Sequence, residues 1–426
     1  MPRHARNRRF LLVFLLGLVG ILLIAAMNVL IDPYLVFDTP RHDGFNRWKT
    51  RFFYQHYASK TLHVQSAGAR HLILGTSTAG ASLRPAHPLF TGQRTFNYAL
   101  AGSTPAIQLL ALRHAVSHNP VKSVILCVDF FAYNAFNEHD ALLEATQAMR
   151  LPDTATAAWR QWRRQLESQL AQALSYRATS DALGTIAGQR SPGYGGRFRD
   201  IGTDGLWQNP RPVGWSQPRM FRVIERQYLG SGWFPDPARR FALTDAAGHS
   251  PLDKLRAILE FSAGHDIAVT ILIMPFHARL AEAMQLAGLW DDFENLKRGI
   301  VRLGEGMPGS RVDIWDFSGY NELTMDPIRD AGHETPWFED AIHPSVATGD
   351  RMLDRVQGLA QGGDSNSATF GSKLDAAQQE QVYRDSLVRR EEYLRLNPRD
   401  VEEVRALAEE TRSYREARLQ SGPAAD

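Results

Sequence analysis

Hydrophobic and polar positions along the chain follow three patterns, and each predicts a different part of the molecule. Residues 10–31 form an apolar run, FLLVFLLGLVGILLIAAMNVLI, without a charged side chain. Short apolar runs at 71–77, 94–102, 121–131, 267–274 and 311–318 alternate with segments of helical spacing. The segment 374–426 is highly charged and carries apolar residues at intervals of three and four. We therefore expect an apolar N-terminal helix, an α/β domain and C-terminal helices.

The apolar run is long enough to cross a bilayer, which takes about 20 residues in a helix. Four arginines lie in the preceding segment 1–9 and predict that this tail stays cytoplasmic. A cleaved signal peptide is the alternative, but its apolar core is usually about 7 to 15 residues long. The pattern favours an uncleaved single-pass anchor at 10–31. In a bacterial cell the anchor would lie in the inner membrane, with the rest of the chain in the periplasm.

The short apolar runs are typical of strands buried on both faces, and helical segments separate them. Helices are expected at 104–118, at 251–264 after a capping box formed by Ser250 and Asp253, at 281–303, and after Ser345. Strands that alternate with helices predict a mainly parallel sheet covered by helices. The expected fold class is therefore α/β, a three-layer sandwich with a mainly parallel central sheet, plus the N-terminal transmembrane helix and a C-terminal helical hairpin.

Changes in composition give the expected domain boundaries. A juxtamembrane segment at 32–69 precedes the α/β domain at 70–360, and an insertion at about 150–245 is rich in Gly, Pro and aromatic residues. An amphipathic helix is expected in its first part, from the spacing of Trp159, Trp162, Leu166, Leu170 and Leu174. The rest of the insertion is expected to be irregular, and its aromatic residues suit either a sugar or acyl ligand or a small core of their own. Residues 361–373 have the composition of a linker. The hairpin at 374–426 is expected to lie on the main domain or on a partner, or to be solvated.

Charge and cysteine content narrow the function. The 426 residues include 48 basic and 46 acidic side chains, a formal net charge of +2, so no general attraction to nucleic acid is expected. Cys127 is the sole cysteine and lies in an apolar run, where a buried structural thiol is expected. The sequence contains no HExxH motif and no carboxylate-rich loop, so we expect no metal and no cofactor.

Candidate catalytic residues follow the predicted strands. Ser77 follows the first strand in HLILGTSTAG, at the carboxyl end where open α/β sheets place their sites. Asp340 and His343 lie in FEDAIHPS, spaced so that the carboxylate reaches the imidazole Nδ1 while Nε2 faces a nucleophile. Gly102 follows the second strand and Asn134 the third, and both are candidate donors to an oxyanion. The alternative is an ordinary turn serine and an ordinary helix start.

This order of blocks resembles that of the SGNH (GDSL-like) hydrolase superfamily, over about residues 70–359. The resemblance implies that Ser77 is the nucleophile, His343 the general base and Asp340 its orienting carboxylate. It further implies an oxyanion hole made by the Ser77 amide, Gly102 and Asn134. Two positions depart from the family pattern: Thr76 stands where the family has aspartate, and the third block reads CVDFFAYN instead of Gly-x-Asn-Asp. The Gly-Thr-Ser block is locally similar to periplasmic alginate O-acetylation proteins.

The resemblance implies an acyl esterase or an O-acyltransferase, with acetyl as the expected acyl group. Its expected substrate is a cell-envelope glycan or an exported polysaccharide, by location beside the inner membrane. Asp129 and His277 are further candidate substrate contacts, and His277 is also an alternative base. The contrasting hypothesis is an inactive SGNH-like scaffold subunit of an envelope polysaccharide assembly. In either case the hairpin is a candidate docking element for envelope biosynthesis proteins.

Overall fold

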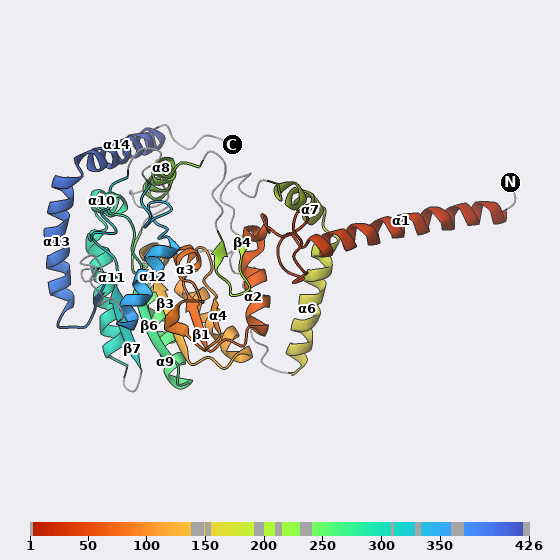
Figure 1. Ribbon diagram of the computed structural model, residues 1–426, viewed down its shortest axis with the longest axis horizontal. Coiled ribbons are helices and arrows are strands. Elements are labelled where there is room, and N and C mark those ends of the chain that lie inside the picture. The colour runs from red at the N-terminus through yellow and green to blue at the C-terminus, as the bar shows by residue number, and fades with distance from the viewer. Residues whose placement is uncertain are drawn as a thin grey trace. The chain divides into compact units, whose positions relative to one another are not determined.

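The computed structural model describes residues 3–137, 149, 155–190, 200–208, 215–230, 241–307, 311–328, 334–358 and 370–420 (Figure 1). The chain forms two compact units. The anchor unit contains Met1–His63, Ala145–Gly202 and Trp207–Trp215, and the sheet unit contains Val64–Glu144, Thr203–Leu206 and Ser216–Asp426. The predicted boundaries differ from these, because most of the insertion belongs with the N-terminal helix and not with the sheet.

A six-stranded sheet, parallel except at one edge, organises the sheet unit (Figure 1). Its strands lie in the order β2-β1-β3-β6-β7-β8. They comprise β1 (His71–Leu74), β2 (Thr95–Asn97), β3 (Ser123–Val128), β6 (Ala268–Ile273), β7 (Val312–Asp316) and β8 (Ser372–Lys373). The chain leaves β1 towards β2 on one side and returns to β3 on the other. Such a switch opens a crevice at the carboxyl ends of the strands, and Ser77 follows β1 at this point.

The first five strands confirm the mainly parallel sheet, but the sheet does not end at β7 as the sequence pattern suggests. The short strand β8 pairs with β7 in antiparallel register, with Ser372 opposite Asp316. It falls inside the predicted linker 361–373, whose residues 361–369 lie outside the described part of the chain. Residues 372–373 are polar, so the sequence does not predict a strand there. A two-residue strand at the edge of a sheet needs no apolar pattern.

Helices connect the strands of the sheet unit. Near the site they are α3 (Ser77–Ser82), α4 (Pro105–His118), α9 (Pro251–Gly264), α10 (Ala278–Leu286), α11 (Trp290–Glu305) and α12 (Val346–Gln357), with the 3-10 turns Pro88–Phe90 and Phe130–Tyr133. The capping box of Ser250 and Asp253 is present at the start of α9, as predicted. The single helix expected at 281–303 is wrong: it is two helices, because the chain turns at Gly288 with φ +72°.

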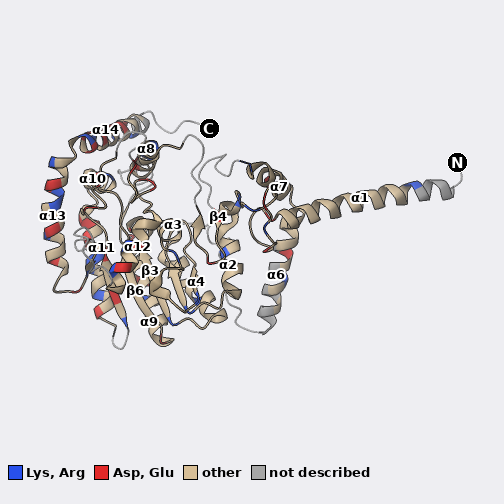
Figure 2. Cartoon of the chain, viewed as in Figure 1, with Lys and Arg blue, Asp and Glu red and all other residues tan. Residues whose placement is uncertain are grey.

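The C-terminal hairpin belongs to the sheet unit. It consists of α13 (Gln379–Leu396) and α14 (Pro398–Gln420), whose surfaces mix both signs of charge (Figure 2). Helix α14 contacts α10 and α8 (Gln217–Tyr228). Arg279 of α10 is buried and binds Glu225 of α8 at 2.7 Å and Asp400 of α14 at 3.0 Å. Of the three arrangements expected for the hairpin, the structure has the one in which it packs on the main domain.

The anchor unit contains α1 (Arg3–Ile31), the turn Phe52–Gln55, α6 (Ala155–Ala173), α7 (Tyr176–Gly188) and the two-stranded sheet of β4 (Asp200–Ile201) and β5 (Trp207–Gln208). Helix α2 (His56–Ser66) begins in this unit. The described part of the insertion is therefore more helical than predicted. Trp207 is buried in the anchor unit, and Phe221 of α8 is buried in the sheet unit. Both serve as core residues there.

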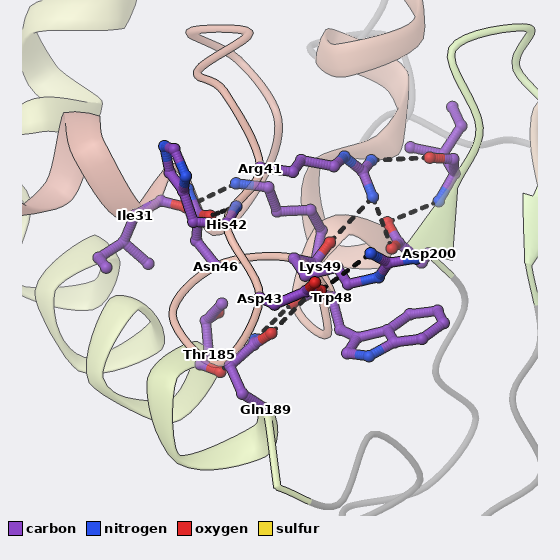
Figure 3. A network of polar contacts seen from close by, with 12 residues as sticks. Ile31, Arg41, His42, Asp43, Asn46, Trp48, Lys49, Thr185, Gln189 and Asp200 are labelled. Atoms are coloured by element: carbon purple, nitrogen blue, oxygen red, sulfur yellow. Dashed lines mark hydrogen bonds and ion pairs between the residues drawn. The ribbon is translucent and has the colours of Figure 1, made fainter.

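Among the described residues, one helix is long and apolar enough to cross a membrane, Arg9–Ile31, a candidate anchor or signal sequence. Its last carbonyls are bound by side chains of the juxtamembrane segment (Figure 3). Lys49 Nζ donates to the Ile31 carbonyl at 2.7 Å, and Asn46 Nδ2 donates to the Leu30 carbonyl at 2.9 Å. Asn46 and Lys49 are fully buried. Helix ends leave carbonyls that need donors, and these two side chains supply them from within the fold.

Candidate active site

The loop after β1 presents Ser77 to solvent while burying its neighbours. Ser77 is the first residue of α3 and is half-buried, whereas Thr76 and Thr78 are fully buried. A side chain at Gly75 would place its Cβ 2.7 Å from the Cβ of Cys127 and 2.9 Å from that of Ala79. Only glycine fits between β3 and α3 at this position, so the close approach of the two elements fixes where Ser77 emerges.

The structure brings the three predicted catalytic residues into one hydrogen-bonded chain. His343 Nε2 lies 2.9 Å from Ser77 Oγ, and His343 Nδ1 lies 2.8 Å and 2.9 Å from the two carboxylate oxygens of Asp340. Asp340 also accepts hydrogen bonds from the backbone amides of Ile342 and His343. Because the carboxylate holds Nδ1, the proton on that nitrogen is fixed and Nε2 can accept the hydroxyl proton of Ser77.

The electrostatics favour an ionised Asp340. Burial alone would raise the pKa of this carboxyl, but the neighbouring His343 and the backbone amides outweigh burial and lower the pKa to about 2. A buried carboxylate that keeps its charge stabilises an adjacent imidazolium. The pair is therefore suited to hold the positive charge that forms on His343 when it takes a proton.

Two neighbouring elements fix the loop that carries Asp340 and His343. Gln217, at the start of α8, donates from Nε2 to the carbonyls of Thr335 and Phe338 and accepts from the Thr335 amide. The amide of His277 donates to the Ala341 carbonyl at 3.0 Å. The loop also closes on itself through a bridge between Phe338 and Pro344. These contacts determine the orientation of His343, and the sequence spacing alone does not reveal them.

Asp129 lies directly behind the nucleophile loop. Its carboxylate accepts from Thr76 Oγ1 at 2.7 Å and from Thr78 Oγ1 at 2.9 Å. Thr76 and Thr78 flank Ser77 in the chain, so one carboxylate at the end of β3 holds both sides of the nucleophile. Burial raises the pKa of Asp129 to about 6 despite these hydrogen bonds, which lower it. Asp129 is 5% exposed and thus supports the loop from within the fold.

The two candidate oxyanion donors have different surroundings. Gly102 is an exposed turn residue with φ +67°, and its loop is tied to Gly75 by the Leu100 amide and the Ser103 hydroxyl, both of which bind the Gly75 carbonyl. The loop therefore adjoins the residue two before Ser77. Asn134 Oδ1 accepts from the amides of Phe136 and Ala242 at 3.2 Å and 3.1 Å. These two hydrogen bonds hold Asn134 in its turn.

His277, a candidate substrate contact and alternative base, lies inside the fold. Its ring is fully buried, its Nε2 bonds to the Asp326 carbonyl at 2.8 Å, and its Nδ1 accepts from the Arg279 amide at 3.2 Å. Burial lowers the pKa of His277 to about 3, which keeps the ring neutral. With both nitrogens engaged as the cap of α10, this histidine is built to support the loop of Asp340.

Sequence reasoning missed Thr76, Thr78 and Gln217 as supports of the site. The threonines carried a usable signal, since hydroxyl residues flank the candidate nucleophile and an acidic residue ends the neighbouring strand. Gln217 carried none, because it lies more than a hundred residues from the loop that it binds. Cys127 is buried as predicted. Within the described residues no group of three or more His, Cys, Asp or Glu side chains could hold a metal ion.

Comparison with known proteins adds little to this geometry. No protein-family model matches the chain, and no curated protein matches it significantly in sequence. A solved structure from Streptococcus pneumonia, provisionally described as a platelet activating factor, aligns at 10% sequence identity with a TM-score of 0.31. The alignment covers 72% of this chain and 94% of that one. Similarity at this level establishes neither a common fold nor a common activity.

Proposed function

We propose that this chain is a membrane-anchored serine acyl esterase or O-acyltransferase of the SGNH-like type, acting through an acyl-Ser77 intermediate. The observation that carries the proposal is the continuous hydrogen-bonded chain from Ser77 through His343 to Asp340. A half-exposed serine, a histidine at hydrogen-bond distance and a buried carboxylate behind it are the parts that nucleophilic acyl transfer requires.

In the first step, Ser77 Oγ attacks the carbonyl carbon of an ester and His343 Nε2 takes the hydroxyl proton. The tetrahedral oxyanion collapses, the acyl–oxygen bond of the substrate breaks, and His343 returns its proton to the departing alcohol. Asp340 stabilises the imidazolium between these events. In the second step, His343 removes a proton from water or from a sugar hydroxyl, which attacks the acyl-serine. The bond between the acyl carbon and Ser77 Oγ then breaks, and His343 returns the proton to Ser77 Oγ. Water gives an esterase, and a sugar acceptor gives a transferase.

By the SGNH resemblance, the oxyanion is held by the backbone amide of Ser77 together with Gly102 and Asn134. The tie between the Gly102 loop and Gly75 supports a place for Gly102 beside Ser77. Preorganised donors of this kind commonly contribute about 10² to 10³ in kcat each. In this role Asn134 would donate from Nδ2, since its side-chain oxygen is an acceptor and binds the amides of Phe136 and Ala242.

The location and the substrate class follow from the anchor. The arginines at the start of α1 favour a cytoplasmic N-terminus, and we propose that the chain beyond α1 lies in the periplasm. The substrate we propose is a glycan of the cell envelope or a polysaccharide exported through the inner membrane, and the acyl group is acetyl. Envelope biosynthesis proteins are the partners that we propose for the exposed face of the C-terminal hairpin.

The test is acyl turnover and covalent labelling of the full chain in detergent. Wild type should hydrolyse an aryl acetate and react with a fluorophosphonate at Ser77. Ser77→Ala should abolish labelling and lower turnover by at least about 10³-fold. Ser117→Ala is the matched serine control, since Ser117 lies on α4 and its hydroxyl binds the His114 carbonyl; it should behave as wild type. Turnover that survives in Ser77→Ala would refute the assignment of Ser77 as the nucleophile.

A folded wild type that neither turns over nor labels would favour the inactive scaffold. Turnover in the presence of a sugar acceptor separates the two enzyme activities, because a transferase gives acylated sugar in excess of free acid. An esterase gives free acid whatever acceptor is added. The partition depends on whether the acyl-enzyme excludes water.

A further inference from the structure

Helix α6 of the anchor unit displays a continuous apolar face to solvent. The α6 stripe consists of Trp159, Trp162, Leu166 and Leu170, together with Leu174 directly after the helix, and these five side chains are 40–60% exposed. Their spacing of three and four residues places them on one side of the helix. Trp159 and Trp162 stack on each other with ring centroids 4.9 Å apart. A face of this size on a described helix needs an apolar neighbour to cover it.

The end of α6 is fixed to the end of the candidate membrane helix. Asn28, in the last turn of α1, donates from Nδ2 to the Ala173 carbonyl at 2.8 Å and to Thr179 Oγ1 of α7 at 2.9 Å. Gln169 of α6 donates to the Val36 carbonyl just after α1. These contacts lie within one compact unit, so the position of α6 relative to α1 is set by direct hydrogen bonds.

The exposure of α1 indicates where it leaves the bilayer. Apolar side chains from Phe10 to Ile24 are exposed, whereas Asn28 and Ile31 are buried among the residues of the anchor unit. On the sides of α1 away from α6 and α7 the exposure continues to Leu30, which is 58% exposed. The stretch from Phe10 to Leu30 is roughly 31 Å long, against about 30 Å for the hydrocarbon core. Asn28, and with it the C-terminal end of α6, is thus at the level of the membrane interface.

Helix α6 runs across the direction of α1 and not along it (Figure 1). A helix that crosses a membrane-spanning helix at the interface lies in the plane of the membrane. Its composition suits that position, because tryptophan is enriched at headgroup level and leucine fills the acyl boundary. Arg163, exposed beside the stripe, pairs with Glu167 at 2.7 Å, and its long side chain is of the kind that reaches from an apolar face to headgroups.

We propose that α6 is an interfacial helix whose stripe inserts into the lipid leaflet at which α1 emerges. The anchor unit then contacts the membrane twice, through one helix that crosses it and one that lies in it. This second contact prevents the unit from swivelling about α1. The proposal depends on α1 as a retained anchor and does not depend on the chemistry of Ser77.

The test uses spin labels on the full chain in nanodiscs that contain anionic and zwitterionic lipid. Leu170→Cys and Leu166→Cys report on the stripe, and Ala171→Cys, exposed on another side of α6, is the matched control. Cys127 is buried, and wild type carried through the same labelling gives the background. At positions 166 and 170 the label should be more accessible to oxygen than to a water-soluble nickel chelate, by at least about threefold relative to position 171.

Two results would overturn the proposal. Equal exposure to the nickel chelate at 170 and 171 would show that the stripe faces water. Protection of 166 and 170 from both reagents would show that protein covers it, either a second copy or another chain. The same measurement in a Ser77→Ala background separates this proposal from the proposed activity. Unchanged oxygen accessibility of the labels at positions 166 and 170 would show that membrane contact does not depend on Ser77.

Discussion

Thr76 and Thr78 give Asp129 a role that explains why the Gly-Thr-Ser-Thr loop contains two threonines. A carboxylate that binds both neighbours of Ser77 restrains the rotation of the loop on either side of the nucleophile. The sequence predicts Ser77 because an apolar strand precedes it, and it predicts Asp340 and His343 because their spacing suits a turn. It does not predict the partners of Asp129, because contacts between the ends of two strands depend on the order of the sheet.

Replacing Asp129 should therefore lower turnover without touching the triad. In Asp129→Ala the two buried hydroxyls lose their acceptor and the loop relaxes, so we expect kcat for an aryl acetate to fall about 10²-fold. Asp129→Asn keeps the shape and one acceptor oxygen, and it should recover part of the loss. Wild-type kcat in a folded Asp129→Ala protein would show that the carboxylate does not position Ser77.

The raised pKa of Asp129 also predicts a pH dependence of stability. Burial raises its pKa from 3.8 to about 6, so between these values the folded state keeps a proton that the unfolded state releases. Stability should fall as pH rises through this window. Asp340 acts in the opposite sense, since its lowered pKa removes stability as pH falls from 3.8 towards 2. Melting temperatures of wild type and Asp129→Asn between pH 4 and about 7 measure the first effect, and the variant should show a flatter profile.

Helices α3 and α12 meet at a glycine, and this contact sets the distance between nucleophile and base. A Cβ at Gly349 would lie 2.1 Å from the Ser82 carbonyl oxygen at the end of α3. Gly349→Ala must push α12 away from α3, and His343, which precedes α12, moves with it. Turnover should fall at least about 10-fold and the melting temperature should drop.

Gly264→Ala on α9 is the matched control, because nothing lies within 4 Å of an added Cβ there. Equal behaviour of the two variants would contradict the argument.

The C-terminal hairpin supports the loop of Asp340 and His343 from a distance. Arg279 joins α14 to α10, whose cap His277 holds the loop of Asp340, and to α8, whose first residue Gln217 holds the same loop. Arg279→Met leaves Glu225 and Asp400 without this partner and should cost about 3–5 kcal/mol of unfolding free energy. Arg298→Met breaks the exposed pair with Glu380 and should change the free energy of unfolding far less.

Deletion of residues 374–426 should abolish turnover for the same reason. The deletion removes Asp400 and Glu403, both bound to the buried Arg279. Full turnover in the truncated chain, with its melting temperature unchanged, would show that the hairpin only docks. The apolar stripes of α13 and α14 were readable from the sequence. On α14 this stripe is the packing surface, since Val401, Val404 and Leu407 are buried. The ion pairs of Asp400 and Glu403 with the buried Arg279 were not readable, because the partners are far apart in the sequence.

For the molecule as a whole, the N-terminal helix is part of a folded unit. Lys49 and Asn46 are buried against the carbonyls of Ile31 and Leu30, and burial lowers the pKa of Lys49 to about 8. Removal of α1 would leave both side chains buried without these acceptors. We therefore expect the mature protein to keep residues 1–31, and intact mass measurement of membrane-extracted protein checks this. A mass that lacks the apolar run would identify a cleaved signal sequence instead.

The discontinuity of the anchor unit has a consequence for biosynthesis. Its segments come from the start of the chain and from ranges that end at Trp215, with much of the β1 to β3 region synthesised between them. At about 5–20 residues per second, α1 leaves the ribosome roughly 10–40 s before the last segment of its unit does. During that interval Asn28 and the other groups that α6 and α7 will bind are exposed to chaperones and lipid. The part of the protein that is made first is therefore among the last to fold.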